Sequence, residues 1–272
     1  MRIDGKQIAS EIISSLKERV DKLKEKGITP HFLIVMLIDD AQTESYIKQK
    51  LLRTEEIGAV AIVKRLPNTT TQEELLRIIE NANKDSEING IIVQRPMPKQ
   101  INEEVIAEAV VPEKDIDGFN PSSRFGVPVA IAVMEILKRV GIEQLDGKKI
   151  TVIGKGITAG KPTIEHLGKL GIEPNVIDSK TTEEQKKEIL ENSDIVISAV
   201  GKKVINPEYL KQGTVVIGIG MHINEMGKLK GDYEEDEIKD IASYYTPTPG
   251  GVGPVNVTML MRNLVEASEL TK

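Results

Sequence analysis

Strand-like and helix-like patterns alternate along the whole chain, and this alternation restricts the possible fold more than any other feature of the sequence. Apolar runs of strand length occur at 32–38, 60–63, 90–94, 149–153, 175–178, 195–199 and 215–219. Helical patterns occupy 7–26, 41–57, 71–83, 101–110, 128–140, 163–170, 182–192 and 257–269. Because strands that alternate with helices stack into layers, the sequence predicts an α/β fold.

The chain is long enough for two domains. Its 272 residues are more than one ordinary hydrophobic core organises. A second unit is expected to begin near Lys148, where strand 149–153 leads into a glycine-rich turn and a helix. A strand, glycine turn and helix in this order are typical of a nucleotide-binding domain.

Composition excludes several classes of protein. No apolar run approaches the roughly 20 residues that a membrane helix needs, and the first residues lack the apolar core of a signal peptide. There is no cysteine, and the three histidines (His31, His166 and His222) are far apart, so we expect no disulfide and no metal site. The net charge of −6 argues against nucleic-acid binding. These features predict a cytoplasmic protein without a membrane or nucleic-acid partner.

The turn Gly154-x-Gly156-x-x-x-Gly160 predicts a nucleotide site. Unpaired N–H groups at the start of a helix attract phosphate, and small residues let a pyrophosphate approach the backbone. The spacing is one residue longer than in the usual dinucleotide fingerprint. The cofactor-binding residues expected here are Gly154, Lys155, Gly156, Thr158 and Gly160.

The residues after strand 175–178 bear on the choice of cofactor. Asp178 alone would suit the ribose hydroxyl of NAD. Ser179 and Lys180, with Lys155 in the glycine turn, would suit the 2′-phosphate of NADP, because a phosphate needs donors and positive charge. We therefore expect NADP rather than NAD. The alternative, that both lysines are solvated loop charges, stays open.

Tyr46 and Lys50 lie four residues apart in the predicted helix 41–57, so both occupy one face of it. A phenol and an amine next to a strand-to-helix turn can act on one small molecule. The amine can do so only if burial or a partner lowers its pKa. Taken alone, this segment fits a solvated helix better than a site.

Four motifs in a fixed order connect these features to a known family. They are Tyr46-x-x-x-Lys50, the segment 90–98 with Gln94 before Arg-Pro-Met-Pro, Asp115-Ile-Asp117-Gly-Phe119, and Thr246-Pro-Thr-Pro-Gly-Gly-Val-Gly-Pro254. The chain resembles the methylenetetrahydrofolate dehydrogenase/methenyltetrahydrofolate cyclohydrolase family over essentially its whole length. The resemblance implies a folate domain of residues 1–121 and 254–272, to which the final helix returns. It also implies a connecting helix within 122–147 and a Rossmann-type dinucleotide domain of residues 148–253, with a cleft between the two domains.

The resemblance also implies an activity. The family uses NADP to oxidise 5,10-methylenetetrahydrofolate to 5,10-methenyltetrahydrofolate, and it hydrolyses the product to 10-formyltetrahydrofolate. The substrate would be a tetrahydrofolate derivative, and the protein would be a homodimer. Three alternatives stay open: an enzyme with the dehydrogenase alone, an enzyme acting on a modified pterin, and a nucleotide-binding protein without catalysis.

The resemblance assigns roles to single residues. Lys50 would be the acid and base of the hydrolysis, Gln94 would hydrogen-bond and orient it, and Tyr46 would stack on the folate or donate its hydroxyl. Asp117 would accept the pterin N–H groups, with an Asx turn before Gly118 as the structural alternative. Additional contacts would come from Gly253 and Pro254 to the folate, and from Ile219 and Asn256 to the cofactor.

The chain departs from the family pattern at three places. Val127-Pro128-Val129-Ala130 replaces a Pro-Cys-Thr-Pro-like segment, so the folate contacts there are in doubt. Lys155-Gly156 replaces an arginine or serine after the first glycine, and this replacement weakens the expected binding of a 2′-phosphate. Val255-Asn256 replaces Met-Thr, although an asparagine can still hydrogen-bond a nicotinamide amide.

Overall fold

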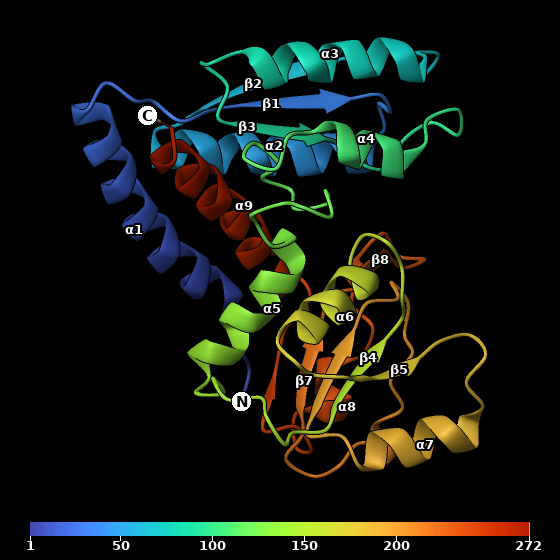
Figure 1. Cartoon of the computed structure of the whole chain (residues 1–272). Helices are drawn as coiled ribbons and strands as arrows, with labels where there is room; N and C mark the ends of the chain where they lie inside the picture. Colours follow the sequence, from blue (N-terminus) through green and yellow to red (C-terminus); the bar gives the residue numbers. More distant parts are fainter. Residues whose placement is uncertain (272) are drawn as a thin grey trace. The chain divides into compact units, whose positions relative to one another are not determined.

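The computed structural model describes residues 1–271 and divides into two compact units, which are considered separately (Figure 1). Unit 1 consists of Met1–Ala9 and Val129–Asn256, and unit 2 consists of Ser10–Pro128 and Val257–Lys272. Both units are α/β, as the alternation of patterns predicts. The predicted cleft between the domains stays a prediction.

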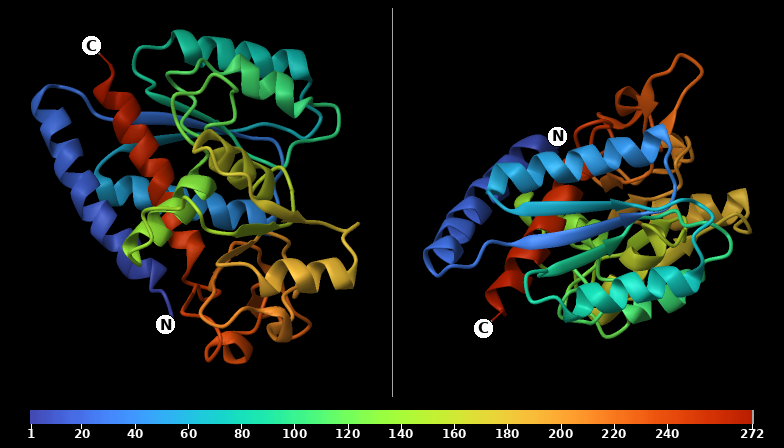
Figure 2. Two further views of the ribbon diagram at one scale, coloured as in Figure 1. Left: turned by 60° about the horizontal axis from the view of Figure 1, so that its bottom comes forward. Right: turned by 90° about the horizontal axis from the view of Figure 1, so that it is seen from above.

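Unit 2 contains a three-stranded parallel sheet in the order β2-β1-β3. Its elements are the main part of α1 (Gly5–Glu25), then β1 (His31–Met36), α2 (Ala41–Ile57), β2 (Val60–Arg65), α3 (Gln72–Lys84), β3 (Gly90–Val93), α4 (Glu103–Ala109) and most of α9 (Val252–Glu269). α3 and α4 cover one face of the sheet and α2 covers the other (Figure 2, right). Since side chains alternate along a strand, Leu33 and Val35 of β1 pack on α3 and α4, whereas the equally buried Phe32 and Ile34 point to the opposite face.

Helix ends in unit 2 follow from local sequence. The Asp40 carboxylate accepts the N–H of Thr43 at 2.7 Å and so begins α2, and Gly58 ends it in the left-handed conformation at φ 76°. Thr71 and Glu74 form the predicted capping box at the start of α3. α1 and α9 lie side by side (Figure 2).

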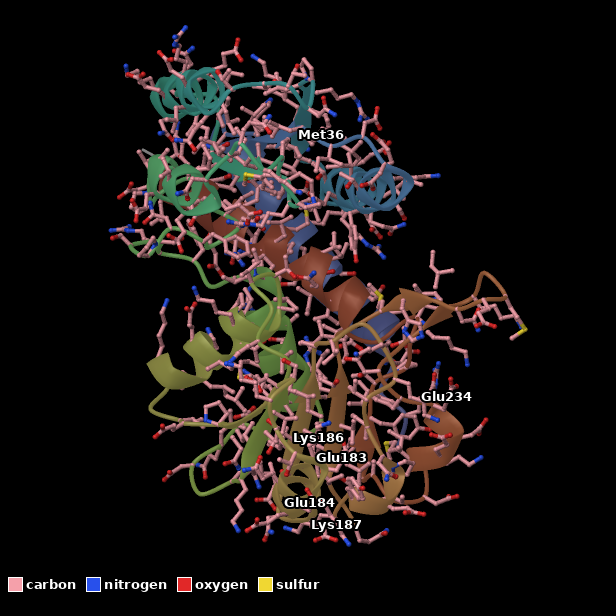
Figure 3. All side chains as sticks on the ribbon, turned by 90° about the vertical axis from the view of Figure 1, so that its right-hand side faces the viewer. Met36, Glu183, Glu184, Lys186, Lys187 and Glu234 are labelled. Atoms are coloured by element: carbon pink, nitrogen blue, oxygen red, sulfur yellow. The ribbon has the colours of Figure 1, made fainter. Side chains whose placement is uncertain are left out.

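Unit 1 contains a five-stranded parallel sheet in the order β10-β7-β6-β4-β5. Its elements are α5 (Pro128–Arg139), β4 (Ile150–Ile153), α6 (Gly160–Lys169), β5 (Asn175–Ile177), α7 (Glu183–Glu191), β6 (Ile195–Ser198), the 3₁₀ turn η1 (Pro207–Tyr209), β7 (Val215–Gly218), β8 (His222–Ile223), β9 (Leu229–Lys230), α8 (Glu235–Ile238) and β10 (Tyr244–Tyr245). The order in which strands are added reverses between the adjacent strands β4 and β6, because β5 lies on one side of β4 whereas β6, β7 and β10 follow on the other. Open α/β sheets bind ligands at such a switch point. The surface helix α7 displays Glu183, Glu184, Lys186 and Lys187 (Figure 3).

The first residues of the chain group with unit 1, whereas the sequence analysis placed 1–121 in one domain. The N–H of Ile3 donates to the carbonyl of Tyr245 at 2.8 Å, and the N–H of Tyr245 donates to the carbonyl of Met1 at 3.0 Å. Arg2 also forms an ion pair with Glu235. These contacts extend the β10 edge of the sheet with the N-terminal segment.

Helices α6 and α9 begin several residues earlier than predicted. α6 starts at Gly160 rather than 163, and α9 starts at Val252 rather than 257. In both cases a proline, Pro162 or Pro254, lies in the first helical turn, where its missing N–H costs no hydrogen bond. The prediction had treated each proline as a residue that precedes the helix.

Among the described helices, none combines the length and the apolar character that a membrane span requires.

Candidate functional site

Lys50 and Gln94 meet at one edge of the unit 2 sheet. Lys50 lies on α2, which follows β1, and Gln94 comes directly after the adjacent strand β3. Nζ of Lys50 donates to Oε1 of Gln94 at 2.8 Å, so the predicted hydrogen bond is present. Nε2 of Gln94 donates in turn to the carbonyl of Arg95 at 2.7 Å, and this second bond turns the amide oxygen toward the lysine.

The amine of Lys50 is tuned by its surroundings. Burial lowers the pKa of Lys50, and the negative charge of Asp117 offsets part of this effect. A lowered pKa increases the fraction of neutral amine near pH 7, and only the neutral amine can accept a proton. The site therefore contains a lysine suited to both accepting and returning a proton.

Asp117 is available for a ligand. Among the described residues, none donates a hydrogen bond to its carboxylate, which is only partly buried. The Asx-type bonds of this loop come instead from Asp115: Oδ1 accepts the N–H of Gly118 at 3.1 Å, and Oδ2 accepts the N–H of Asn120 at 2.8 Å. The geometry thus supports the binding interpretation of Asp117 and assigns the turn to its neighbour.

The sequence analysis gave Asp115 no role of its own. Its side chain is 3% exposed, and burial raises its pKa to about 6, with a smaller contribution from the charge of Asp117. The spacing of the motif contained a usable signal, since an aspartate three residues before a glycine can accept that glycine's N–H. Gly118 has φ 73°, a conformation that favours glycine.

Tyr46 lies one turn before Lys50 on α2 and is 37% exposed. No described residue hydrogen-bonds its hydroxyl, so the hydroxyl can bond a ligand. The structure therefore brings Lys50, Gln94 and Asp117 together in unit 2, with Tyr46 one turn from Lys50 on the same helix.

The glycine turn of unit 1 is built around two glycines and leaves room at the third. Gly154 has φ 90°, and a Cβ on it would lie 2.8 Å from the carbonyl oxygen of Ala199. A Cβ on Gly160 would lie 2.1 Å from the carbonyl oxygen of Gly154, whereas a Cβ on Gly156 would meet nothing within 4 Å. α6 begins here without a side-chain cap. The N–H of Lys161 donates to the carbonyl of Gly156 at 2.9 Å and Pro162 has no N–H, so the N–H of Gly160 is the donor of this first turn that can bind a phosphate. These residues fit the pyrophosphate of a dinucleotide.

The carboxylate of Asp178 is already engaged by its own loop. Its Oδ2 lies 2.5 Å from Nζ of Lys155, and its Oδ1 accepts the N–H of Lys180 at 2.8 Å. The hydrogen bond from Lys155 is the main reason that the pKa of Asp178 is lowered. Ser179 and Lys180 are exposed beside it, as is Thr158 in the glycine turn. A carboxylate paired in this way is a poor acceptor for a ribose hydroxyl, and the exposed donors suit a phosphate.

Asp232 is a second residue that the sequence analysis missed. Its fully buried carboxylate accepts four hydrogen bonds from the end of β6 and the loop that follows it, at 2.7 to 3.1 Å. The donors are the Ser198 hydroxyl and the N–H groups of Val200, Gly201 and Lys202. Ile219, expected at the cofactor, is held beside this loop by its N–H bond to the carbonyl of Ser198 at 2.7 Å. Asp232 follows no periodic pattern, so the sequence offered no signal for it.

The remaining predicted residues lie in the first turns of α9. Gly253, Pro254 and Asn256 belong to unit 1, and a Cβ on Gly253 would meet nothing within 4 Å. The loop before them is fixed by Thr246, whose hydroxyl accepts the N–H of Gly218 at 2.8 Å. Among residues 1–271, no group of three or more His, Asp or Glu side chains could hold a metal ion.

Comparisons with known proteins match both units. The family model described as the tetrahydrofolate dehydrogenase/cyclohydrolase catalytic domain matches residues 3–117, and the model for the NAD(P)-binding domain of the same family matches residues 128–272. The bifunctional protein FolD of Staphylococcus aureus (strain Newman) is 36% identical over 99% of this chain and 97% of that protein.

Solved structures agree with the sequence matches. The bifunctional methylenetetrahydrofolate dehydrogenase/cyclohydrolase of Campylobacter jejuni has a TM-score of 0.94 at 32% identity, over 99% of this chain and 98% of that one. The enzyme of Trypanosoma brucei, complexed with NADP and an inhibitor, has a TM-score of 0.92 at 31% identity, over 99% and 97%.

Proposed function

The chain belongs to the tetrahydrofolate dehydrogenase/cyclohydrolase family, and from that premise we propose which of its residues perform the two reactions. The enzyme oxidises 5,10-methylenetetrahydrofolate to 5,10-methenyltetrahydrofolate with NADP, and it hydrolyses this product to 10-formyltetrahydrofolate. The observation that supports the hydrolytic step best is the buried Lys50 amine, held at 2.8 Å by the Gln94 amide.

The oxidation needs little acid or base chemistry from the protein. Hydride leaves a carbon between two nitrogens, whose lone pairs delocalise the cation that forms. NADP, when bound, supplies the hydride acceptor. The task of the chain is then to position two rings, and positioning can contribute a large share of catalysis. The glycine turn would hold the pyrophosphate, and Ile219 and Asn256 would contact the nicotinamide side of the cofactor.

The hydrolysis requires proton transfer. Water adds to the methenyl carbon, and the water must lose a proton as the new C–O bond forms. The neutral amine of Lys50 would accept this proton. The resulting ammonium would return it to the ring nitrogen as the C–N bond breaks, and the new hydroxyl would release its own proton to solvent as its oxygen becomes the carbonyl of the formyl group on the other nitrogen. Gln94 stabilises the ammonium by accepting a hydrogen bond without adding a negative charge.

Substrate binding would depend on Asp117 and Tyr46. A free carboxylate can accept two parallel N–H bonds from a pterin, and charge-assisted bonds of this kind are strong. An exposed phenol ring one turn from Lys50 can stack on the substrate. Gly253 and Pro254 would add backbone contacts to the folate.

The cofactor site favours NADP on charge grounds. With Asp178 occupied by Lys155 and the Lys180 N–H, the exposed Ser179 and Lys180 are the groups that would meet a 2′-substituent. Thr158 and Gly156 would lie on the phosphate side of the same site. We also propose that the enzyme is a cytoplasmic homodimer, as the composition and the family resemblance predict.

Initial rates with purified protein test this function. The first assay supplies 5,10-methylenetetrahydrofolate with NADP or NAD and follows the reduced nicotinamide. The second supplies 5,10-methenyltetrahydrofolate alone and follows its loss. We expect both activities, with NADP as the better cofactor. Nucleotide binding without turnover of either substrate would contradict the proposal.

A further inference from the structure

Arg95 links the two loops that present Gln94 and Asp117. Its guanidinium carbon lies 3.6 Å from the centroid of the Phe119 ring. Its Nε donates to Oε2 of Glu103, at the start of α4, at 2.9 Å. The Arg95 side chain is only 11% exposed, so both contacts are largely shielded from water. All three residues belong to unit 2.

The position of Arg95 in the chain gives these contacts a consequence for the site. Its carbonyl accepts the Nε2 hydrogen bond that turns the Gln94 amide toward Lys50. Its side chain stacks on Phe119, which lies two residues after Asp117. One residue therefore fixes the amide through its backbone and the carboxylate loop through its side chain.

We propose that Arg95 is a positioning residue for the hydrolytic step, which holds Gln94 and Asp117 at fixed places around the Lys50 amine. The inference rests on the proposed function, because it assumes that Lys50 transfers the proton. Arginine suits this task because its planar group stacks on an aromatic ring while its Nε binds a carboxylate. A leucine side chain would provide neither the positive charge nor the planar group of N–H donors.

The hydrolysis should depend on these contacts of Arg95 more than the oxidation does. Proton transfer needs donor and acceptor within about 3 Å, whereas hydride transfer depends mainly on how the two rings are placed. Gln94 and Asp117 are the groups of the described chain that act on Nζ of Lys50, one as an acceptor and one as a charge. Both favour the ammonium. If either moves away, the pKa of Lys50 falls, and the pH at which hydrolysis gains activity falls with it.

Variants on both sides of the stack test the proposal. We expect Arg95→Leu and Phe119→Leu each to reduce kcat for hydrolysis by about tenfold and to change hydride transfer by less than about threefold. Each should also lower, by roughly half a pH unit, the pH at which the hydrolysis rate increases. Arg95→Lys, which keeps the charge, should recover part of the rate. The double variant should lose less than the sum of the single losses, because both remove one contact.

Arg77→Leu is the matched control, because Arg77 pairs with Glu73 on α3 in the same unit. It should leave both activities and the pH profile unchanged. The proposal would be wrong if Arg95→Leu and Phe119→Leu kept the normal pH profile. It would also be wrong if both reactions fell equally together with a lower melting temperature. If the unaltered enzyme did not hydrolyse 5,10-methenyltetrahydrofolate, the proposed function would fail first, and the two failures are thus distinguishable.

Discussion

Oε1 of Gln94 accepts a hydrogen bond from Nζ of Lys50 at 2.8 Å, and this contact joins helix α2 to the end of strand β3. The partner is neutral, so it orients the amine without adding a negative charge. Burial can therefore keep the pKa of Lys50 low, although the charge of Asp117 acts in the opposite direction. A carboxylate in place of Gln94 would raise the pKa of Lys50 again.

Gln94→Glu tests the importance of a neutral partner. A carboxylate next to Nζ would stabilise the ammonium and raise the pKa of Lys50. The pH at which the hydrolysis rate increases should therefore rise by roughly one unit or more. The rate near pH 7 should fall and should recover at higher pH. Gln49→Glu, on an exposed position of α2, is the control. An unchanged profile, or a shift to lower pH, would contradict the role of Gln94.

Asp117→Asn tests the folate contact. An amide cannot accept two N–H bonds with a negative charge, and hydrogen bonds to charged groups contribute about 1.5–3 kcal/mol. The KM for 5,10-methylenetetrahydrofolate should rise roughly ten- to hundredfold, while the KM for NADP stays the same. Steady-state kinetics with each substrate varied in turn provide the measurement, and Asp85→Asn at an exposed position serves as control. A normal folate KM would favour a purely structural role.

Asp115→Asn tests the buried carboxyl through stability. Burial raises the pKa of Asp115 from 3.8 to about 6. Between these values the folded protein binds more protons than the unfolded chain, so this group lowers stability as pH rises from about 4 to about 6. The loss should approach roughly 3 kcal/mol above that range.

Urea unfolding of wild type and Asp115→Asn at pH 4 and pH 7 measures this effect. The variant lacks the titration, so its stability relative to wild type should increase with pH. Asp21→Asn, at an exposed position on α1, should show no such trend. Parallel behaviour of Asp115→Asn and wild type at the two pH values would disprove the assignment.

Lys180→Ala tests the basis of cofactor choice. Lys180 is exposed beside the paired Asp178, and its charge would meet a 2′-phosphate but no group of NAD. The KM for NADP should rise about tenfold and that for NAD should not change, since one charge-assisted contact is lost. Lys187→Ala, on the exposed surface of α7, should affect neither cofactor. Equal losses with both cofactors would argue against 2′-phosphate recognition by this lysine.

Much of this fold could be predicted because its main elements are long and periodic. The strands of both sheets other than β10, and the capping box at Thr71, follow directly from local pattern. The short elements η1, β8, β9, α8 and β10 were missed, because two to four residues are too few to show a period. The starts of α6 and α9 were placed late because a proline in the first turn resembles one that precedes a helix.

The site was partly predictable for a similar reason. Tyr46, Lys50, Gln94 and Asp117 belong to motifs whose order is visible in the sequence. Arg95 and Asp232 act on a ring and on backbone groups that only the folded chain brings near them. Asp115 bonds N–H groups three and five residues later, so its local signal was available but not used. Sequence spacing contains no information about a stack between Arg95 and Phe119, which lie 24 positions apart.

The most direct test of the account is Lys50→Met, with Lys48→Met on the exposed face of α2 as the control. Both reactions are measured on the same purified variant. We predict that hydrolysis of 5,10-methenyltetrahydrofolate falls at least about a hundredfold, since general acid–base catalysis is removed, while NADP-dependent oxidation keeps a measurable rate. Normal hydrolysis by Lys50→Met would show that the buried amine is not the proton carrier.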